Sequence, residues 1–335
     1  MMAMRRLALL ALVSVALFSI GCEKEDLPGF REPAAGPGIS FTSPDDGDEV
    51  ASSSIRVRVK TDGVDLAPDA IGAPPVDGEA HYHYYVNGSA AGESAGADFL
   101  VTDLVPGEHE ITARLFENDH QPIAGASPAS VRVTIPDDAP RVSIVTPSTG
   151  ALVNASSVEL TVAWENYSSG RWHAYVDALE GDPRGVGSNP TSIVTRLEPG
   201  EHTIFVRLHH SGGDAFEPEV VDVIHVEIPA GAPSVRIVNP DYGSIVPRDA
   251  PIQVEATNFS IDGNQAGGEN EPGQGHYHVY IDGYDSGHMW QEGYWAYTTV
   301  NGAPTGTREI YVRLMNNDHT SIEPKIVDRV EVVVE

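Results

Sequence analysis

The feature that most constrains the fold of this chain is an internal repeat that occurs three times. The copies open at Gly38, Arg141 and Ser234, each with a short run of alternating apolar and polar residues that ends in proline. Further alternating runs follow in each copy, separated by turn residues that include many of the 33 glycines and 25 prolines. Alternation with a period of two is typical of strands with one buried face. The chain is therefore predicted to be all-β.

Each copy contains some seven short alternating runs, a pattern that resembles the immunoglobulin/fibronectin-type β-sandwich. The resemblance implies three tandem immunoglobulin-like modules, which we call module 1 (38–137), module 2 (138–230) and module 3 (231–335). Short segments bracketed by prolines, 136–140 and 229–233, are the expected linkers. A resemblance of fold says little about function, which has to come from particular side chains.

The N-terminal 21 residues have the pattern of a secretion signal: a short basic start, then an apolar stretch too short to be a good membrane span. Cys22, the only cysteine of the chain, follows a small residue directly after this stretch. This resembles the lipobox of bacterial lipoproteins, in which cleavage precedes a cysteine that becomes lipid-modified. The resemblance implies a signal peptide at 1–21 and a flexible tether at 22–37. The alternative is an ordinary secretory signal with an incidental cysteine.

A lipid on Cys22 would anchor the chain to a membrane and place it in the bacterial cell envelope. We expect it on the outer membrane, facing either the periplasm or the surface. The charge excludes nucleic acid as a partner: 49 acidic residues against 20 basic ones give a formal net charge of -29, which repels phosphates. A single cysteine also excludes an internal disulfide framework and any cysteine-rich metal site.

Modules 1 and 3 carry the same histidine pattern. A His-Tyr-His motif opens the third predicted strand, and Asn-Asp-His follows the sixth. In an immunoglobulin-like sandwich these strands are antiparallel neighbours, so the start of one lies beside the end of the other. Side-chain alternation places all three histidines on the solvent side of the sheet. The predicted metal ligands are His81, His83 and His120 in module 1, and His276, His278 and His319 in module 3.

Module 2 is an internal control for this pattern. It keeps His173, but Arg171 stands at the first position and Gly213 at the position of the third histidine. The joint loss of two positions from an otherwise similar module indicates that the histidines form one functional set. Three imidazoles suit Cu(II) or Zn(II), since neither cysteine nor a methionine cluster favours Cu(I). His288 is a possible additional ligand in module 3.

A second class of function is a non-catalytic structural or adhesive surface lipoprotein that binds a protein or glycan partner. The histidine pattern would then be inherited by duplication of one module. Aromatic side chains of module 3 would offer a platform for a sugar, and these are Tyr284, Trp290, Tyr294 and Trp295.

An enzyme is the third class, and we do not expect one. Three histidines around zinc resemble carbonic anhydrase, and His-x-His on a sandwich strand resembles copper/zinc superoxide dismutase. The third histidine lies too far along the chain for the first, and the second lacks its remaining ligands and its disulfide. The cupin pattern fails because no glutamate follows His-x-His at the expected spacing. The favoured interpretation is a metal-binding lipoprotein of the cell envelope.

Replacing the predicted lipidation site tests the anchor. Cys22→Ser removes the thiol that would accept the lipid, so the variant should accumulate as an unprocessed or soluble species. The measurement is membrane fractionation combined with labelling by a radioactive fatty acid. A Cys22→Ser protein that still carries acyl label and sediments with membranes would show that the lipoprotein interpretation is wrong.

Overall fold

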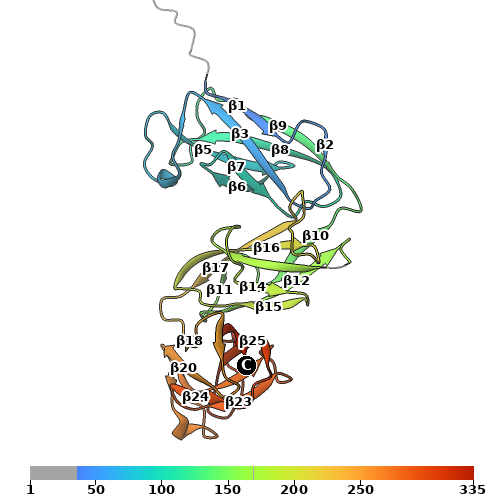
Figure 1. Ribbon diagram of the computed structural model, residues 1–335. Helices are drawn as coiled ribbons and strands as arrows, with labels where there is room; N and C mark the ends of the chain where they lie inside the picture. The colour runs from blue at the N-terminus through green and yellow to red at the C-terminus, as the bar shows by residue number, and fades with distance from the viewer. Residues whose placement is uncertain (1–35, 169) are drawn as a thin grey trace, which may run out of the picture. The chain divides into compact units, whose positions relative to one another are not determined.

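The computed structural model describes residues 36–168 and 170–335. The predicted signal peptide, Cys22 and nearly all of the predicted tether lie outside these residues. The described part contains strands and two short 3-10 helices, but no α-helix, which confirms the predicted all-β class (Figure 1). Within it, no helix has the length and apolar character needed to cross a membrane.

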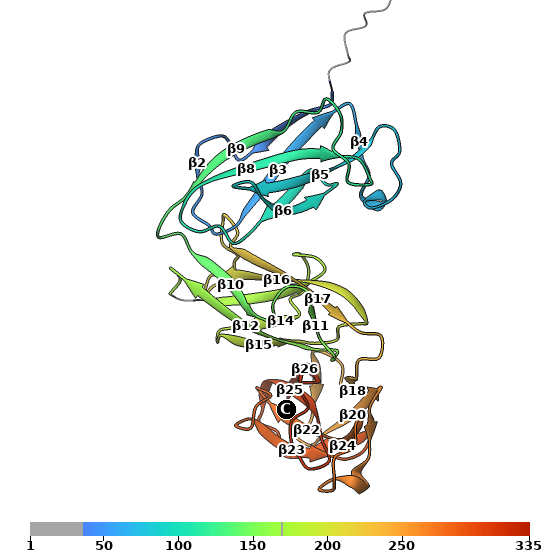
Figure 2. The same cartoon turned by 180° about the vertical axis from the view of Figure 1, so that it is seen from behind.

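Module 1 is a sandwich of two sheets. One sheet has the order β1-β3-β7, and the other has the order β2-β9-β8-β5-β4, with β6 also paired to β5 (Figures 1 and 2). The bounds of its elements are β1 Gly38–Ser43, β2 Asp48–Glu49, β3 Ile55–Asp62, β4 Asp65–Leu66, η1 Pro68–Ala70, β5 Glu79–Val86, β6 Ser89–Ser94, β7 Asp98–Val101, β8 Gly107–Phe116 and β9 Ala129–Ile135.

Module 2 repeats this plan with sheets β10-β12-β15 and β11-β17-β16-β13-β14. Its strands are β10 Arg141–Thr146, β11 Ala151–Leu152, β12 Val158–Glu165, β13 Arg171–Val176, β14 Gly185–Gly187, β15 Thr191–Val194, β16 Gly200–His209 and β17 Val221–Ile228. Because each module has two facing sheets in this order, whose main strands pair antiparallel, the predicted tandem immunoglobulin-like sandwich is confirmed.

Module 3 has sheets β18-β20-β24 and β19-β26-β25-β22-β21, with β23 also paired to β22. Its elements are β18 Ser234–Asn239, β19 Ser244–Val246, β20 Ala250–Thr257, β21 Ser260–Ile261, η2 Gly263–Gln265, β22 Gln274–Ile281, β23 Met289–Gly293, β24 Tyr297–Val300, β25 Gly306–Met315 and β26 Val327–Val334.

The buried core lies between the two sheets of each module. In module 1 the inward side chains alternate along each strand, as Tyr82 and Tyr84 do on β5 and Ile111 does on β8, all three with no exposed surface. Strand β5 pairs antiparallel with β8, and the register places His81 opposite Phe116, the last residue of β8. The expected neighbourhood of the third and sixth strands is thus confirmed.

Modules 1 and 3 differ from module 2 in one inserted segment. Residues 63–78 connect β3 to β5 and form β4 and η1, and residues 258–273 connect β20 to β22 and form β21 and η2. In both modules the short extra strand pairs in parallel with the histidine-bearing strand. Module 2 makes the same connection with residues 166–170 alone. The insertion therefore accompanies the histidine pattern.

Module 2 contains a buried acid, Asp222, that holds β10 to β17. Its carboxylate accepts the N–H of Ile144 at 2.6 Å and that of Val223 at 2.7 Å. Burial is the main cause that raises the pKa of Asp222, to about 6, although these two hydrogen bonds favour its charged form. Ionisation of Asp222 at neutral pH therefore lowers the free energy of unfolding.

The pH dependence of stability tests this assignment through Asp222→Asn. A pKa raised in the folded state means that the proton bound there adds stability below about pH 4, and that this stability is lost as pH rises through about 6. Between pH 4 and 7 the unfolding free energy of wild type should fall relative to that of Asp222→Asn by up to ~2–3 kcal/mol. Urea denaturation at both pH values measures the difference.

Asp328 of module 3 supplies the matched control. Its carboxylate also accepts a backbone N–H, that of Ile237, but it forms a bidentate ion pair with Arg196. Asp328→Asn should therefore destabilise the chain at pH 7, because it leaves Arg196 without its partner. If Asp222→Asn destabilises equally at both pH values, the raised pKa of Asp222 is refuted.

Candidate metal centre

Strand β5 presents His81 and His83 on one face, two residues apart. His81 has no exposed surface, and its counterpart His276 on β22 has none either, while His278 is 6% exposed. These histidines lie on the sheet face opposite the core, as the alternation predicts, but the expectation that His81, His276 and His278 are exposed to solvent there is wrong. The inserted segment and the turn after β8 meet at this end of the sheet and shield the first histidine of the strand from water.

A turn, and not a continuation of the strand, brings the third histidine to the other two. Strand β8 ends at Phe116, which bridges back to Pro122. Within the turn the N–H of His120 donates to the carbonyl of Glu117 at 2.9 Å, and the N–H of Gln121 donates to the Asp119 side chain at 3.2 Å. His319 lies in an equivalent turn after β25.

A buried asparagine fixes each turn against the inserted segment. In module 1 the Asn118 carbonyl accepts the N–H of Gly72 at 2.7 Å, and its side chain donates to Glu79 at 2.7 Å. In module 3 the carbonyl of Asn317 accepts the N–H of Gly267 at 2.6 Å. Neither asparagine has exposed surface. The Asn-Asp-His motif thus contains one ligand and one residue that positions it.

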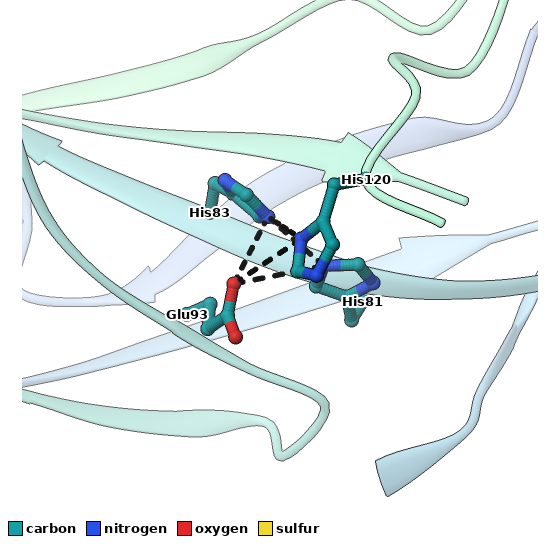
Figure 3. A group of neighbouring side chains, drawn as sticks. All are labelled: His81, His83, Glu93 and His120. Atoms are coloured by element: carbon teal, nitrogen blue, oxygen red, sulfur yellow. Dashed lines mark hydrogen bonds and ion pairs between the residues drawn. The ribbon is translucent and has the colours of Figure 1, made fainter. Parts of the chain in front are cut away.

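In module 1 four donor atoms surround one point (Figure 3). His81 Nε2 lies 2.9 Å from His83 Nε2, which lies 3.2 Å from His120 Nδ1. The Oε2 atom of Glu93 lies 3.3 Å from His83 Nε2, 3.4 Å from His120 Nδ1 and 4.0 Å from His81 Nε2. The predicted triad is therefore brought together, with a carboxylate added.

Module 3 repeats the histidine geometry. His276 Nε2 lies 3.1 Å from His278 Nε2 and 3.0 Å from His319 Nδ1, and the latter two atoms are 3.4 Å apart. Glu292 Oε1 lies 3.6 Å from His319 Nδ1. The three nitrogens form a group that a metal ion could bridge, whereas Glu292 stands outside this group.

Glu93 and Glu292 are residues that the sequence analysis did not find. Strand pairing places Glu93 opposite His83 and Glu292 opposite His278, and the same pairing in module 2 places Val186 opposite His173. The available signal was a glutamate that recurs in modules 1 and 3 and is absent from module 2. It was obscured because the hairpin between the histidine strand and the glutamate strand differs in length between the modules.

The third histidine occupies a backbone conformation that favours glycine. His120 has φ +63° and His319 has φ +64°, both in the left-handed region, and the matching residue of module 2 is Gly213 with φ +99°. A side chain with a Cβ costs about 1 kcal/mol in this region compared with glycine. Modules 1 and 3 therefore carry histidine at a position where it lowers stability, as residues at functional sites often do.

Burial keeps the clustered imidazoles neutral. It lowers the pKa of His81 and of His83, and neighbouring histidines lower both further, while the negative charge of Glu93 acts in the opposite direction. In module 3 burial lowers the pKa of His276 and of His278 to about 4. Neutral imidazoles are the form that binds metal ions. The buried Nδ1 atoms of His81 and His276 have no partner among the described residues, so packing and not a second hydrogen bond orients these rings.

Module 2 shows what the same framework does without the donors. His173 stacks on His209 with ring centroids 3.9 Å apart, and the Tyr175 hydroxyl lies 3.2 Å from His209 Nε2. Among the described residues of module 2, no group of three potential ligands converges. The predicted contrast between module 2 and the other two modules is therefore present in the structure.

The remaining histidines singled out in the sequence lie elsewhere. His288 follows the far end of β22, where its Nδ1 lies 2.7 Å from Asp285, so it is not a member of the module 3 cluster. His109 and His202 lie at the opposite end of their sheets, and each bonds a backbone carbonyl at 2.7 Å, those of Val105 and Glu198. Neither belongs to a cluster.

The four aromatic residues considered for a sugar platform do not share one environment. The Tyr284 hydroxyl donates to Glu159 of module 2, and this ring is largely covered by protein. Tyr294 packs beside His276, with ring centroids 5.5 Å apart. Trp290 and Trp295 are 41% and 55% exposed. Only these two tryptophans are free to act as an open platform.

Comparison with known proteins supplies no family for this chain. No family model matches it, and no curated protein matches it. Solved structures with similar folds are fibronectin(III)-like modules of Clostridium thermocellum CbhA (15% identity, 58% of this chain and 94% of that chain, TM-score 0.22), immunoglobulin domains 1–5 of Sidekick-1 (12%, 90% and 58%, 0.20) and Bacteroides ovatus SGBP-B in complex with a mixed-linkage heptasaccharide (10%, 89% and 70%, 0.21).

With TM-scores near 0.2, none of these likenesses carries weight on function. The fold class rests on the strand order of the chain itself. The molecule is a tandem immunoglobulin-like β-sandwich protein in which the first and third modules gather histidines, and the second does not.

Stability measurements test whether the third histidine is held at a cost. His319→Gly restores the residue that module 2 has at this position, so the metal-free variant should be more stable than wild type by up to ~1 kcal/mol. The reverse change, Gly213→His in module 2, should destabilise by a similar amount. Thermal denaturation in the presence of a chelator measures both. A destabilised His319→Gly protein would refute the strain at this position.

Proposed function

We propose that this chain is a cell-envelope lipoprotein that binds one divalent transition-metal ion in module 1 and one in module 3, without enzymatic activity. The observation that carries the proposal is the convergence of imidazole nitrogens from a strand and a distant turn, in two copies. Neighbouring nitrogens lie 2.9–3.4 Å apart, and all donor atoms of a group lie within 4.8 Å of one another. A hydrogen bond between two imidazoles can account for one such contact, with one nitrogen donating and the other accepting. Three nitrogens that converge on one point are the donor set of a metal ion.

The separations favour Zn(II) over Cu(II). A tetrahedral ion with bonds of about 2.0–2.1 Å has its ligand atoms about 3.3–3.4 Å apart. In module 1 the separations of Glu93 from the three histidines, and of His83 from the other two, range from 2.9 to 4.0 Å, which surrounds this value. Cu(II) prefers tetragonal arrangements, which require two pairs of ligand atoms lying opposite each other at about 4 Å. His81 Nε2 and Glu93 Oε2 lie 4.0 Å apart, but the two remaining donor atoms, His83 Nε2 and His120 Nδ1, are only 3.2 Å apart.

Duplication of one module explains why the pattern occurs twice, but it does not explain what module 2 has lost. Arg171, Val186 and Gly213 replace three of the four donors there, while the strands and the turn remain. A folding requirement would have kept them. Joint replacement of several donors is expected when a metal site is no longer used, because the remaining donors cannot bind the metal without the others.

The alternative function is a structural or adhesive lipoprotein with a protein or glycan partner. The exposed Trp290 and Trp295 of module 3 favour it, because flat exposed aromatic rings suit a sugar. This function makes no use of the clusters. Metal stoichiometry therefore separates the two proposals.

Zinc titration of the full-length protein in detergent, after removal of metal, tests the proposal. We expect about two equivalents to bind, and His120→Gly and His319→Gly each to remove about one. Loss of a direct ligand should weaken its site by more than about 100-fold, which is the upper end of what outer-shell changes cause. His202→Gln, at the opposite end of its sheet, should keep both equivalents. If the chain binds no zinc, or if its zinc stoichiometry is unchanged in both glycine variants, the result supports the adhesive function instead.

A further inference from the structure

The two clusters differ in the state of their carboxylate. In module 1 the Oε2 atom of Glu93 lies within 4.0 Å of all three histidine nitrogens. In module 3 the Oε2 atom of Glu292 instead accepts a hydrogen bond from the Tyr294 hydroxyl, and Oε1 approaches only His319. The carboxylate is thus a member of the first donor group and not of the second.

In module 3 the inserted segment packs against this tyrosine, and module 1 has no equivalent tyrosine. Gly263 opens η2 in the inserted segment and lies against Tyr294, so closely that a Cβ at Gly263 would fall 2.6 Å from the Cβ of Tyr294. Strand pairing aligns Glu93 with Glu292, and counting two residues on from each gives Ala95 at the position of Tyr294. Alanine has no hydroxyl with which to hold a carboxylate, so Glu93 remains free to join its cluster.

The two clusters also differ in the arginine that lies beside them, which is buried in module 3 and exposed in module 1. Arg313 lies opposite His278 on β25 and is 6% exposed. Its Nη2 lies 3.4 Å from Oε1 of the exposed Glu323, whereas its buried Nε has no partner among the described residues. Its counterpart Arg114, opposite His83, is exposed. Module 3 therefore places a shielded guanidinium next to its cluster, with one nitrogen paired to Glu323 and the buried Nε unpaired, while Tyr294 holds the carboxylate of Glu292. A small anion bound at the cluster would add negative charge beside this guanidinium.

We propose, on the basis of the proposed metal binding, that the metal site of module 3 keeps an open coordination position that takes a small anion from solution, whereas Glu93 closes the site of module 1. Three histidines with a fourth position free are the arrangement of zinc sites that exchange ligands, and four protein ligands are that of closed structural sites. One chain would then hold one site of each kind.

Cobalt(II) in place of zinc, with azide as the anion, tests the difference in the full-length protein. His120→Gly leaves the module 3 site alone, and His319→Gly leaves the module 1 site alone. Azide should change the visible spectrum of cobalt in the His120→Gly protein and leave that of the His319→Gly protein unchanged. Tyr294→Phe, added to His120→Gly, frees Glu292 and should weaken azide binding at least about tenfold. Tyr297→Phe, which alters an exposed hydroxyl nearby, should not.

The outcomes separate this inference from the function on which it rests. If cobalt fails to bind the His120→Gly protein, the metal function of module 3 is refuted, and the inference with it. If cobalt binds but azide changes neither spectrum, or changes both equally, only the open position is refuted. Unchanged azide affinity in the Tyr294→Phe protein would likewise refute the role given to the tyrosine.

Discussion

The antiparallel pairing of β5 with β8, repeated by β22 with β25, is the constraint on which both clusters depend. Its register places the first histidine of one strand opposite the last residue of the other. Only then does the turn that follows bring the third imidazole within reach. A shift by one residue would turn both strand histidines into the core and the tyrosines out of it. The core and the clusters are therefore held by the same pairing.

Much of this arrangement was predictable from the sequence, because it follows from strand periodicity and sandwich topology. The alternation around His81 and His276 predicted that each shares a sheet face with the second histidine of its strand. The strand order predicted that the sixth strand, which leads to the third histidine, is the adjacent strand. The match of Gly213 to His120 and His319 is also present in the structure, since all three follow a strand that bridges back at the same spacing. These features depend on local pattern and a fixed topology.

The features that were missed depend on parts of the chain without such rules. Glu93 reaches His83 through a hairpin whose register shifts between Tyr84 and Tyr85, so its distance along the chain carries no recognisable spacing. Burial of His81 depends on an inserted segment, 63–78, which the repeat pattern does not reveal because module 2 has only five residues at this place. His288 lies apart from the cluster because its backbone pairs with Ile281 at the far end of β22, beyond His276 and His278.

The left-handed position in the turn has a consequence for how such a protein changes over generations. Replacing histidine by glycine there relaxes the backbone, so random change that removes the site meets no opposition from folding. The opposite change, from glycine to histidine, lowers stability before any ligand is gained. Random mutation therefore favours glycine at this position, as in module 2. In a module that still has histidine in this turn, selection for something other than stability has kept it.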